Sequence, residues 1–79
     1  MNKLTNASFS QLVVQYERLV YTVCFQLVRD AAAAEDLTQE TFCQAVRSID
    51  RFKGDCKVSV WLCQIAKHLW YQHLRRRRP

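Results

Sequence analysis

An all-α fold, a compact bundle of three to four helices, is the fold class that this sequence predicts. The 79 residues include one glycine and one proline, and the proline is the last residue. No segment alternates apolar and polar residues with the period of two that is typical of strands. Apolar residues make up 49% of the chain. A chain this short buries only about 60% of the surface that it exposes when unfolded. We therefore expect one thin core.

The first expected helix covers residues 8–29. Ser8 and Gln11 have the spacing of a capping box at its start. At 100° per residue the apolar residues fall on one stripe, which comprises Phe9, Leu12, Val13, Tyr16, Val20, Val23 and Leu27. We expect this stripe to face the core.

The second expected helix covers residues 30–49, with Asp30 as its N-cap. Helical phase places one set of residues on the core side, namely Ala34, Leu37, Thr41, Phe42, Ala45 and Ile49. The opposite side is uniformly polar and comprises Asp36, Gln39, Glu40, Cys43 and Arg47. Taken by itself, such a side is more typical of a solvated helix face than of a docking surface.

A loop at residues 50–57 and a third helix at residues 58–76 complete the chain, before residues 77–79. Gly54 is the residue that takes positive φ at little cost, and Asp55 is the expected cap of the helix that follows. On that helix the expected core residues are Val58, Leu62, Ile65, Ala66 and Leu69. The opposite side carries Gln64, Lys67, His68 and Tyr71.

The four cysteines do not have the spacing of a metal site or a disulfide framework. They contain no C-x-x-C pair, so free thiols are expected, with Cys24 near the core and Cys43 exposed. No nucleophile and base pair or glycine-rich phosphate loop indicates catalysis, and we expect neither enzymatic activity nor a cofactor. The sequence also has no signal peptide or membrane-spanning run, which predicts a cytoplasmic protein without membrane insertion.

Charge is distributed unevenly along the chain, whose net charge is +5. Residues 1–46 carry three basic and five acidic side chains, whereas residues 47–79 carry nine basic and two acidic ones. The basic part also contains Phe52, Trp61, Trp70 and Tyr71, and cations interleaved with aromatics are typical of single-strand nucleic-acid binding. The plainer alternative places Trp61 in the core and leaves the terminal arginines as a solvated tail.

Three segments resemble a known family when they are taken in order. AEDLTQETFCQAV begins at Ala34, DRFKGD at Asp50 and VWLCQIAKHLWYQHLRRRR at Val60. Together they resemble region 2 of the extracytoplasmic-function (ECF) group of bacterial RNA polymerase sigma factors. The resemblance extends from Phe9 to the end of the chain.

The resemblance implies a transcription initiation module with two partners. The second helix would dock on the clamp helices of the largest catalytic subunit of core RNA polymerase, through Asp36, Gln39, Glu40, Cys43 and Arg47. The loop and third helix would recognise and melt the promoter minus-ten element by holding its non-template strand. The residues expected there are Arg51, Phe52, Lys53, Gly54, Gln64, Lys67, His68, Tyr71, Arg75 and Arg76.

The resemblance also implies an anti-sigma factor as a partner, and a helix-turn-helix domain (region 4) that is not expected within this chain. His68 departs from the family pattern, because an asparagine is usual at this position after Ile65 and Ala66. Cys56 and Lys57 replace the small polar residues that usually open the last helix. These departures imply a divergent base preference on the same fold. The competing hypothesis is a small helical protein-interaction domain without DNA binding.

Overall fold

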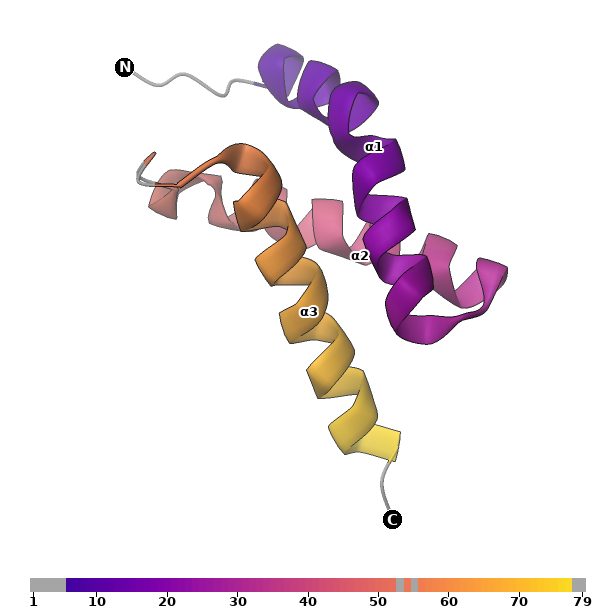
Figure 1. The fold of residues 1–79 in the computed structure, drawn as a ribbon. Helices are drawn as coiled ribbons and strands as arrows, with labels where there is room; N and C mark the ends of the chain where they lie inside the picture. The colour runs from indigo at the N-terminus through magenta and orange to yellow at the C-terminus, as the bar shows by residue number, and fades with distance from the viewer. Residues whose placement is uncertain (1–5, 53, 55, 78–79) are drawn as a thin grey trace.

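Three helices and one short 3-10 turn form the structure, a computed structural model that describes residues 6–52, 54 and 56–77. Side chains are described within these ranges from Ser10 to Arg76. The elements are α1 (Asn6–Val28), α2 (Ala31–Ser48), the 3-10 turn η1 (Ile49–Arg51) and α3 (Val58–Arg77). Each helix packs against the other two, and α2 crosses behind α1 and α3 in the view of Figure 1. The all-α fold class predicted from the sequence is confirmed.

The core lies where the three helices meet. The stripes predicted for α2 and α3 face it, and Val20 and Cys24 of α1 are fully buried beside them. The buried apolar residues are Leu12, Val20, Cys24, Ala34, Leu37, Phe42, Ala45, Leu62, Ala66 and Leu69. The side chain of Phe9, which was expected on the same stripe, lies outside the described residues. The apolar periodicity therefore predicted the buried faces, although Val23 and Ile49 are half-buried and are not among the residues packed in or against the core.

Two threonines of α2 are buried within this apolar core. The hydroxyl of Thr38 donates to the carbonyl of Ala34 at 2.7 Å, and the hydroxyl of Thr41 donates to the carbonyl of Leu37 at 2.7 Å. A buried hydroxyl without a partner would be costly. These bonds to the preceding turn satisfy both hydroxyls inside their own helix, which allows polar residues on the core face.

Cysteine placement agrees with the sequence-based prediction. Cys24 is fully buried and Cys43 is exposed, and all four cysteines are free thiols. Burial raises the pKa of the Cys24 thiol, although hydrogen bonds to Thr38 and Thr41 oppose this effect. Cys24 is therefore a small packing residue of the core.

The start of α1 differs from the prediction. The helix begins at Asn6, so Ser8 lies inside it and the expected N-cap at Ser8 is wrong. Asn and Ser recur at positions 6, 8 and 10, and each is a residue type favoured at helix starts. The sequence pattern therefore did not indicate which of these residues begins α1.

The connection between α1 and α2 has one strained residue and one capping residue. Arg29 has φ of 56°, in the left-handed region that favours glycine. Directly after it, the carboxylate of Asp30 accepts a hydrogen bond from the backbone N–H of Ala33 at 2.8 Å. The predicted role of Asp30 as N-cap of α2 is confirmed.

We expect Arg29→Gly to stabilise the fold, because glycine adopts positive φ without a steric cost. The gain should be at most about 1 kcal/mol, which raises the melting temperature of a domain this small by about 4–8 °C per kcal/mol. Thermal unfolding followed by circular dichroism measures it. Arg29→Ala is the matched control, since it removes the same charge and keeps the strained backbone. An equal effect of both substitutions would contradict the strain argument.

The loop between η1 and α3 contains another residue with positive φ among those that the structure describes. Gly54 has φ of 78°, as the sequence predicted for this position. The carbonyl of Lys57 accepts the hydrogen bond from the N–H of Trp61 at 3.0 Å, which puts Lys57 at the N-cap position of α3. The expected cap, Asp55, lies outside the described residues.

Candidate functional site

The polar side of α2 forms one exposed surface. It comprises Asp36, Gln39, Glu40, Cys43 and Arg47, all of which are exposed, and we call it the α2 polar face. The opposite side of the same helix carries its six buried residues. Burial of Leu37 and Phe42 thus sets the rotation of α2 and directs the polar side chains outward together.

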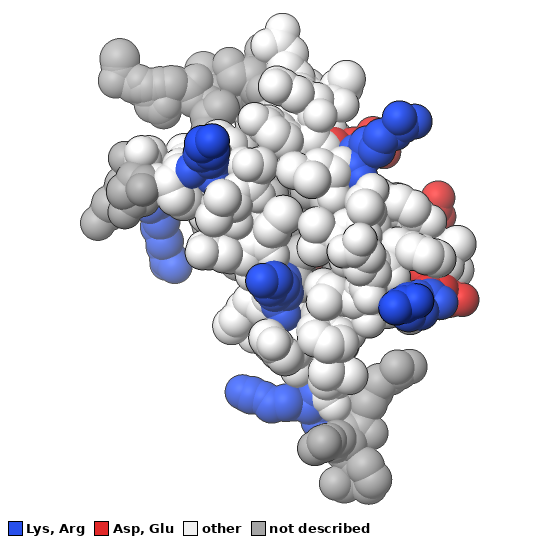
Figure 2. All heavy atoms as spheres, viewed as in Figure 1, with Lys and Arg blue, Asp and Glu red and all other residues white. Residues whose placement is uncertain are grey.

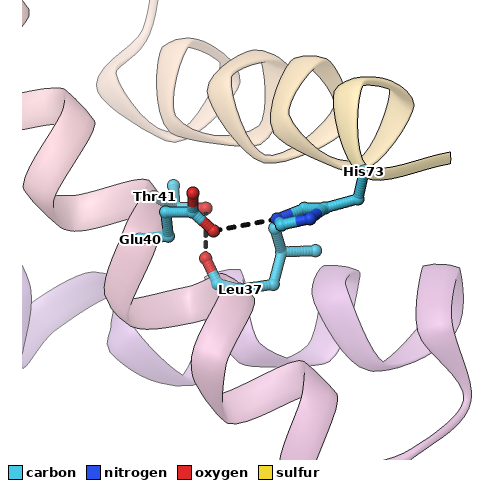
Figure 3. A network of polar contacts seen from close by, with 4 residues as sticks. All are labelled: Leu37, Glu40, Thr41 and His73. Carbon is cyan, nitrogen blue, oxygen red and sulfur yellow. Dashed lines mark hydrogen bonds and ion pairs between the residues drawn. The ribbon is translucent and has the colours of Figure 1, made fainter. Parts of the chain in front are cut away.

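One residue of this face is bonded to another helix. The imidazole Nε2 of His73 on α3 lies 3.0 Å from Oε1 of Glu40, and each side chain is 45% exposed. Figure 3 shows His73 reaching across from α3 to Glu40, beside the bond from Thr41 to Leu37. The sequence did not indicate this contact, since the two residues are 33 positions apart.

A groove of about 580 Å³ lies beside this contact, between the end of α1, the first turns of α2 and the last turns of α3. Its apolar lining is Leu27, Val28, Ala33, Leu37, Trp70 and Leu74. Its polar lining is Asp30, Asp36, Glu40 and His73. Asp36 and Glu40 belong to the α2 polar face, so this face continues into a partly apolar depression.

The outer side of α3 carries the second group of candidate residues. The exposed residues of this helix include Gln64, Lys67, His68, Tyr71, Arg75 and Arg76, and we call them the α3 basic face. Tyr71 is 58% exposed. In Figure 2, Lys and Arg side chains recur along the side where α3 lies, whereas acidic side chains are seen only towards the opposite edge. The face therefore offers cations beside an accessible aromatic ring.

A shallow depression of about 490 Å³ lies at the C-terminal end of the α3 basic face. It is lined by His68, Tyr71, Gln72, Arg75 and Arg76. Nε2 of His68 lies 3.2 Å from Nε2 of Gln72, one turn further along the helix. Gln72 was not among the predicted residues, and its side chain contacts the imidazole of His68.

The described loop residues differ in their exposure. The ring of Phe52 lies 4.7 Å from that of Trp61 between centroids, and both side chains are half-buried. Trp61 packs against the core, as the plainer alternative predicted. Phe52 therefore has one face on Trp61, while Arg51 and Gly54 are exposed and Lys53 lies outside the described residues.

The two faces lie on different helices, and the bond between Glu40 and His73 connects these helices, although His73 is not part of the α3 basic face. Within the described part of the chain, no three His, Cys, Asp or Glu side chains are grouped to hold a metal ion. None of the described helices has the length and apolar character required to cross a membrane. The structure thus presents two polar surfaces on a small helical core.

Comparisons with known proteins assign this architecture. Residues 12–79 match the family Sigma-70 region 2. The chain is 33% identical to the ECF RNA polymerase sigma factor SigW of Bacillus subtilis over 72 residues, and 36% identical to the RNA polymerase sigma-H factor of Pseudomonas aeruginosa over 74 residues. Each alignment covers 91% of this chain and 38% of the relative.

A third relative is the ECF RNA polymerase sigma factor BldN of Streptomyces coelicolor, which is 38% identical over 69 residues. That alignment covers 86% of this chain and 26% of the relative. No solved structure matches the chain significantly. The match to the family extends from Leu12 through all three helices, and the chain belongs to the Sigma-70 region 2 family, within the ECF group of RNA polymerase sigma factors.

Proposed function

We propose that this chain is a transcription initiation module that docks on the clamp helices of the largest subunit of core RNA polymerase. The α2 polar face is the docking surface. The observation that carries the proposal is the common exposure of Asp36, Gln39, Glu40, Cys43 and Arg47 on one side of α2. Carboxylates on such a surface make charge-assisted, often bidentate hydrogen bonds with arginine, which fix orientation as well as adding affinity.

The second part of the proposal concerns promoter DNA. The α3 basic face, with Arg51 and the loop, binds the non-template strand of the minus-ten element. Cations such as Lys67 and Arg75 follow the phosphates, and the exposed ring of Tyr71 stacks on an unpaired base. Binding of this kind melts DNA by favouring the unpaired state, since unpaired bases gain contacts that paired bases lack.

In this proposal the polymerase catalyses RNA synthesis, and an anti-sigma factor regulates docking. Sigma factors are generally not enzymes, and we propose that the polymerase alone catalyses RNA synthesis. We propose the cytoplasm as the site of action, because the polymerase works there. An anti-sigma factor that covered the α2 polar face would prevent docking by occupying the same carboxylates.

Reversing two charges tests the docking surface. We expect Asp36→Lys with Glu40→Lys to weaken binding to a clamp-helix fragment by about 100-fold or more, because loss of a hydrogen-bonded charge pair costs several kcal/mol. Isothermal titration calorimetry with the 79-residue chain measures the dissociation constant. Circular dichroism should remain unchanged, since both side chains are exposed.

The matched control is Glu17→Lys with Gln15→Lys and Gln26→Lys, which makes the same change of net charge. All three side chains are exposed on α1, away from the α2 polar face. We expect the control to bind nearly as tightly as the wild type. Retained binding by the Asp36 and Glu40 variant would disprove docking through this face. Docking without any binding of single-stranded DNA would instead favour a protein-interaction domain.

A further inference from the structure

We propose that His73 is a positioning residue of the docking surface. It holds the Glu40 carboxylate by Oε1, so that Oε2 is presented to a basic side chain of the partner. This inference rests on the proposed docking function and adds a residue of α3 to a surface otherwise built from α2. His73 was not among the residues that the sequence pointed to.

The chemistry of the contact defines which atom donates. A carboxylate only accepts hydrogen bonds, so Nε2 of His73 carries the proton, as it does in one neutral tautomer and in the imidazolium. The bond joins Nε2 to Oε1 at 3.0 Å. Among the described residues, His73 is the recorded partner of this carboxylate, and it engages one of the two oxygens. The second oxygen keeps its capacity to accept.

Both ends of the bond are attached to well-packed parts of the core. Next to Glu40, Thr41 is fully buried and bonded to Leu37, which is 3% exposed (Figure 3). Leu69, one turn before His73, is 7% exposed, and Trp70 packs against the core. Because the two backbones are anchored in this way, a single hydrogen bond restricts the rotamers of Glu40.

The surroundings explain why a donor is useful at this place. Asp30, Asp36 and Glu40 all line the same groove, so that three carboxylates lie around a partly apolar depression. Two residues that line this groove carry a side-chain donor, the imidazole of His73 and the indole of Trp70, and the bond to a carboxylate that the structure shows is made by His73. Its bond holds Glu40 in place before the partner arrives.

Preorganisation of this kind predicts a moderate effect on affinity. Ordering a flexible side chain on binding costs about 0.5–1.5 kcal/mol, which corresponds to about 2- to 12-fold in the dissociation constant. We therefore expect His73→Ala to weaken binding of the clamp-helix fragment by about 3- to 10-fold. His73→Gln keeps a donor on a side chain that can reach Glu40, and it should restore affinity to within about 2-fold of the wild type.

A double-mutant cycle separates positioning from a purely structural role. In a Glu40→Ala background, His73→Ala should change the dissociation constant by less than about 2-fold, because no carboxylate remains to be held. Thermal unfolding of each variant is measured in parallel. A fall in melting temperature without a change in affinity would overturn the proposal, as would equal or tighter binding by His73→Ala or an undiminished effect of it in the Glu40→Ala background.

The binding measurements distinguish the positioning role of His73 from docking through the α2 polar face. If the wild-type chain does not bind the clamp-helix fragment, docking through the α2 polar face is disproved and the role of His73 falls with it. If the wild type binds and the reversal of Asp36 and Glu40 abolishes binding while His73→Ala has no effect, docking stands and only the positioning role is overturned.

Discussion

Leu62→Ala is expected to destabilise the fold by about 2–5 kcal/mol. Leu62 is fully buried and is the largest side chain that the structure encloses completely, at the meeting point of α3 with the other helices. Its truncation removes apolar contacts and leaves a cavity that the backbone cannot fill. The free energy of unfolding of a small domain is about 5–15 kcal/mol in total. The substitution therefore removes a large part of it.

Urea unfolding followed by circular dichroism tests this expectation. Val60→Ala is the matched control, because Val60 lies on the same helix and is 43% exposed. We expect the control to change the free energy of unfolding by about 0.5 kcal/mol or less. Equal unfolding midpoints of the two variants would show that the three helices do not share one cooperative core.

Binding of single-stranded minus-ten DNA is expected to weaken by about 50-fold between about 50 and about 200 mM salt. The estimate takes four phosphate contacts and a slope of about −0.7 per contact for single strands. Among the described residues, the exposed cations proposed to contact the strand are Arg51, Lys67, Arg75 and Arg76. Fluorescence anisotropy with a labelled oligonucleotide, in the presence of the clamp-helix fragment, measures the dependence.

A single cation should account for a defined part of the slope of log affinity for DNA against log salt concentration. Lys67→Ala is expected to reduce its magnitude by about 0.7, since one phosphate contact is lost. Arg18→Ala is the matched control, because Arg18 is an exposed cation on α1. Its slope should equal that of the wild type. If both variants behaved alike, the DNA interaction would reflect net charge and not the α3 basic face.

Much of the fold could be predicted because helical periodicity is a local property. The apolar stripe of α2 required its polar residues to share the opposite side, and all five of them are exposed. The capping role of Asp30 followed from its position before the alanine run, and its carboxylate bonds the N–H of Ala33. The start of α1 was misplaced because several favourable capping residues stand close together.

The candidate site was less predictable where helices meet. The contact between the rings of Phe52 and Trp61, whose centroids are 4.7 Å apart, was not predicted, and the role of Phe52 towards a base stays a prediction. Trp61 lies nine positions further along the chain, beyond the loop, so only the path of that loop brings the rings together. The groove beside α2 also escaped prediction, because its lining comes from three separate helices.

The sequence by itself determined that this protein is a helical bundle in which a helix with one polar side precedes a basic helix, because helical phase, caps and the order of charges are properties of neighbouring residues. Only the tertiary structure decided which side chains of different helices meet. Glu40 and His73 are 33 positions apart, and their 3.0 Å bond exists because burial of the core fixes how α2 and α3 lie against each other. Contacts of that kind depend on packing between helices, which no periodicity within one helix encodes.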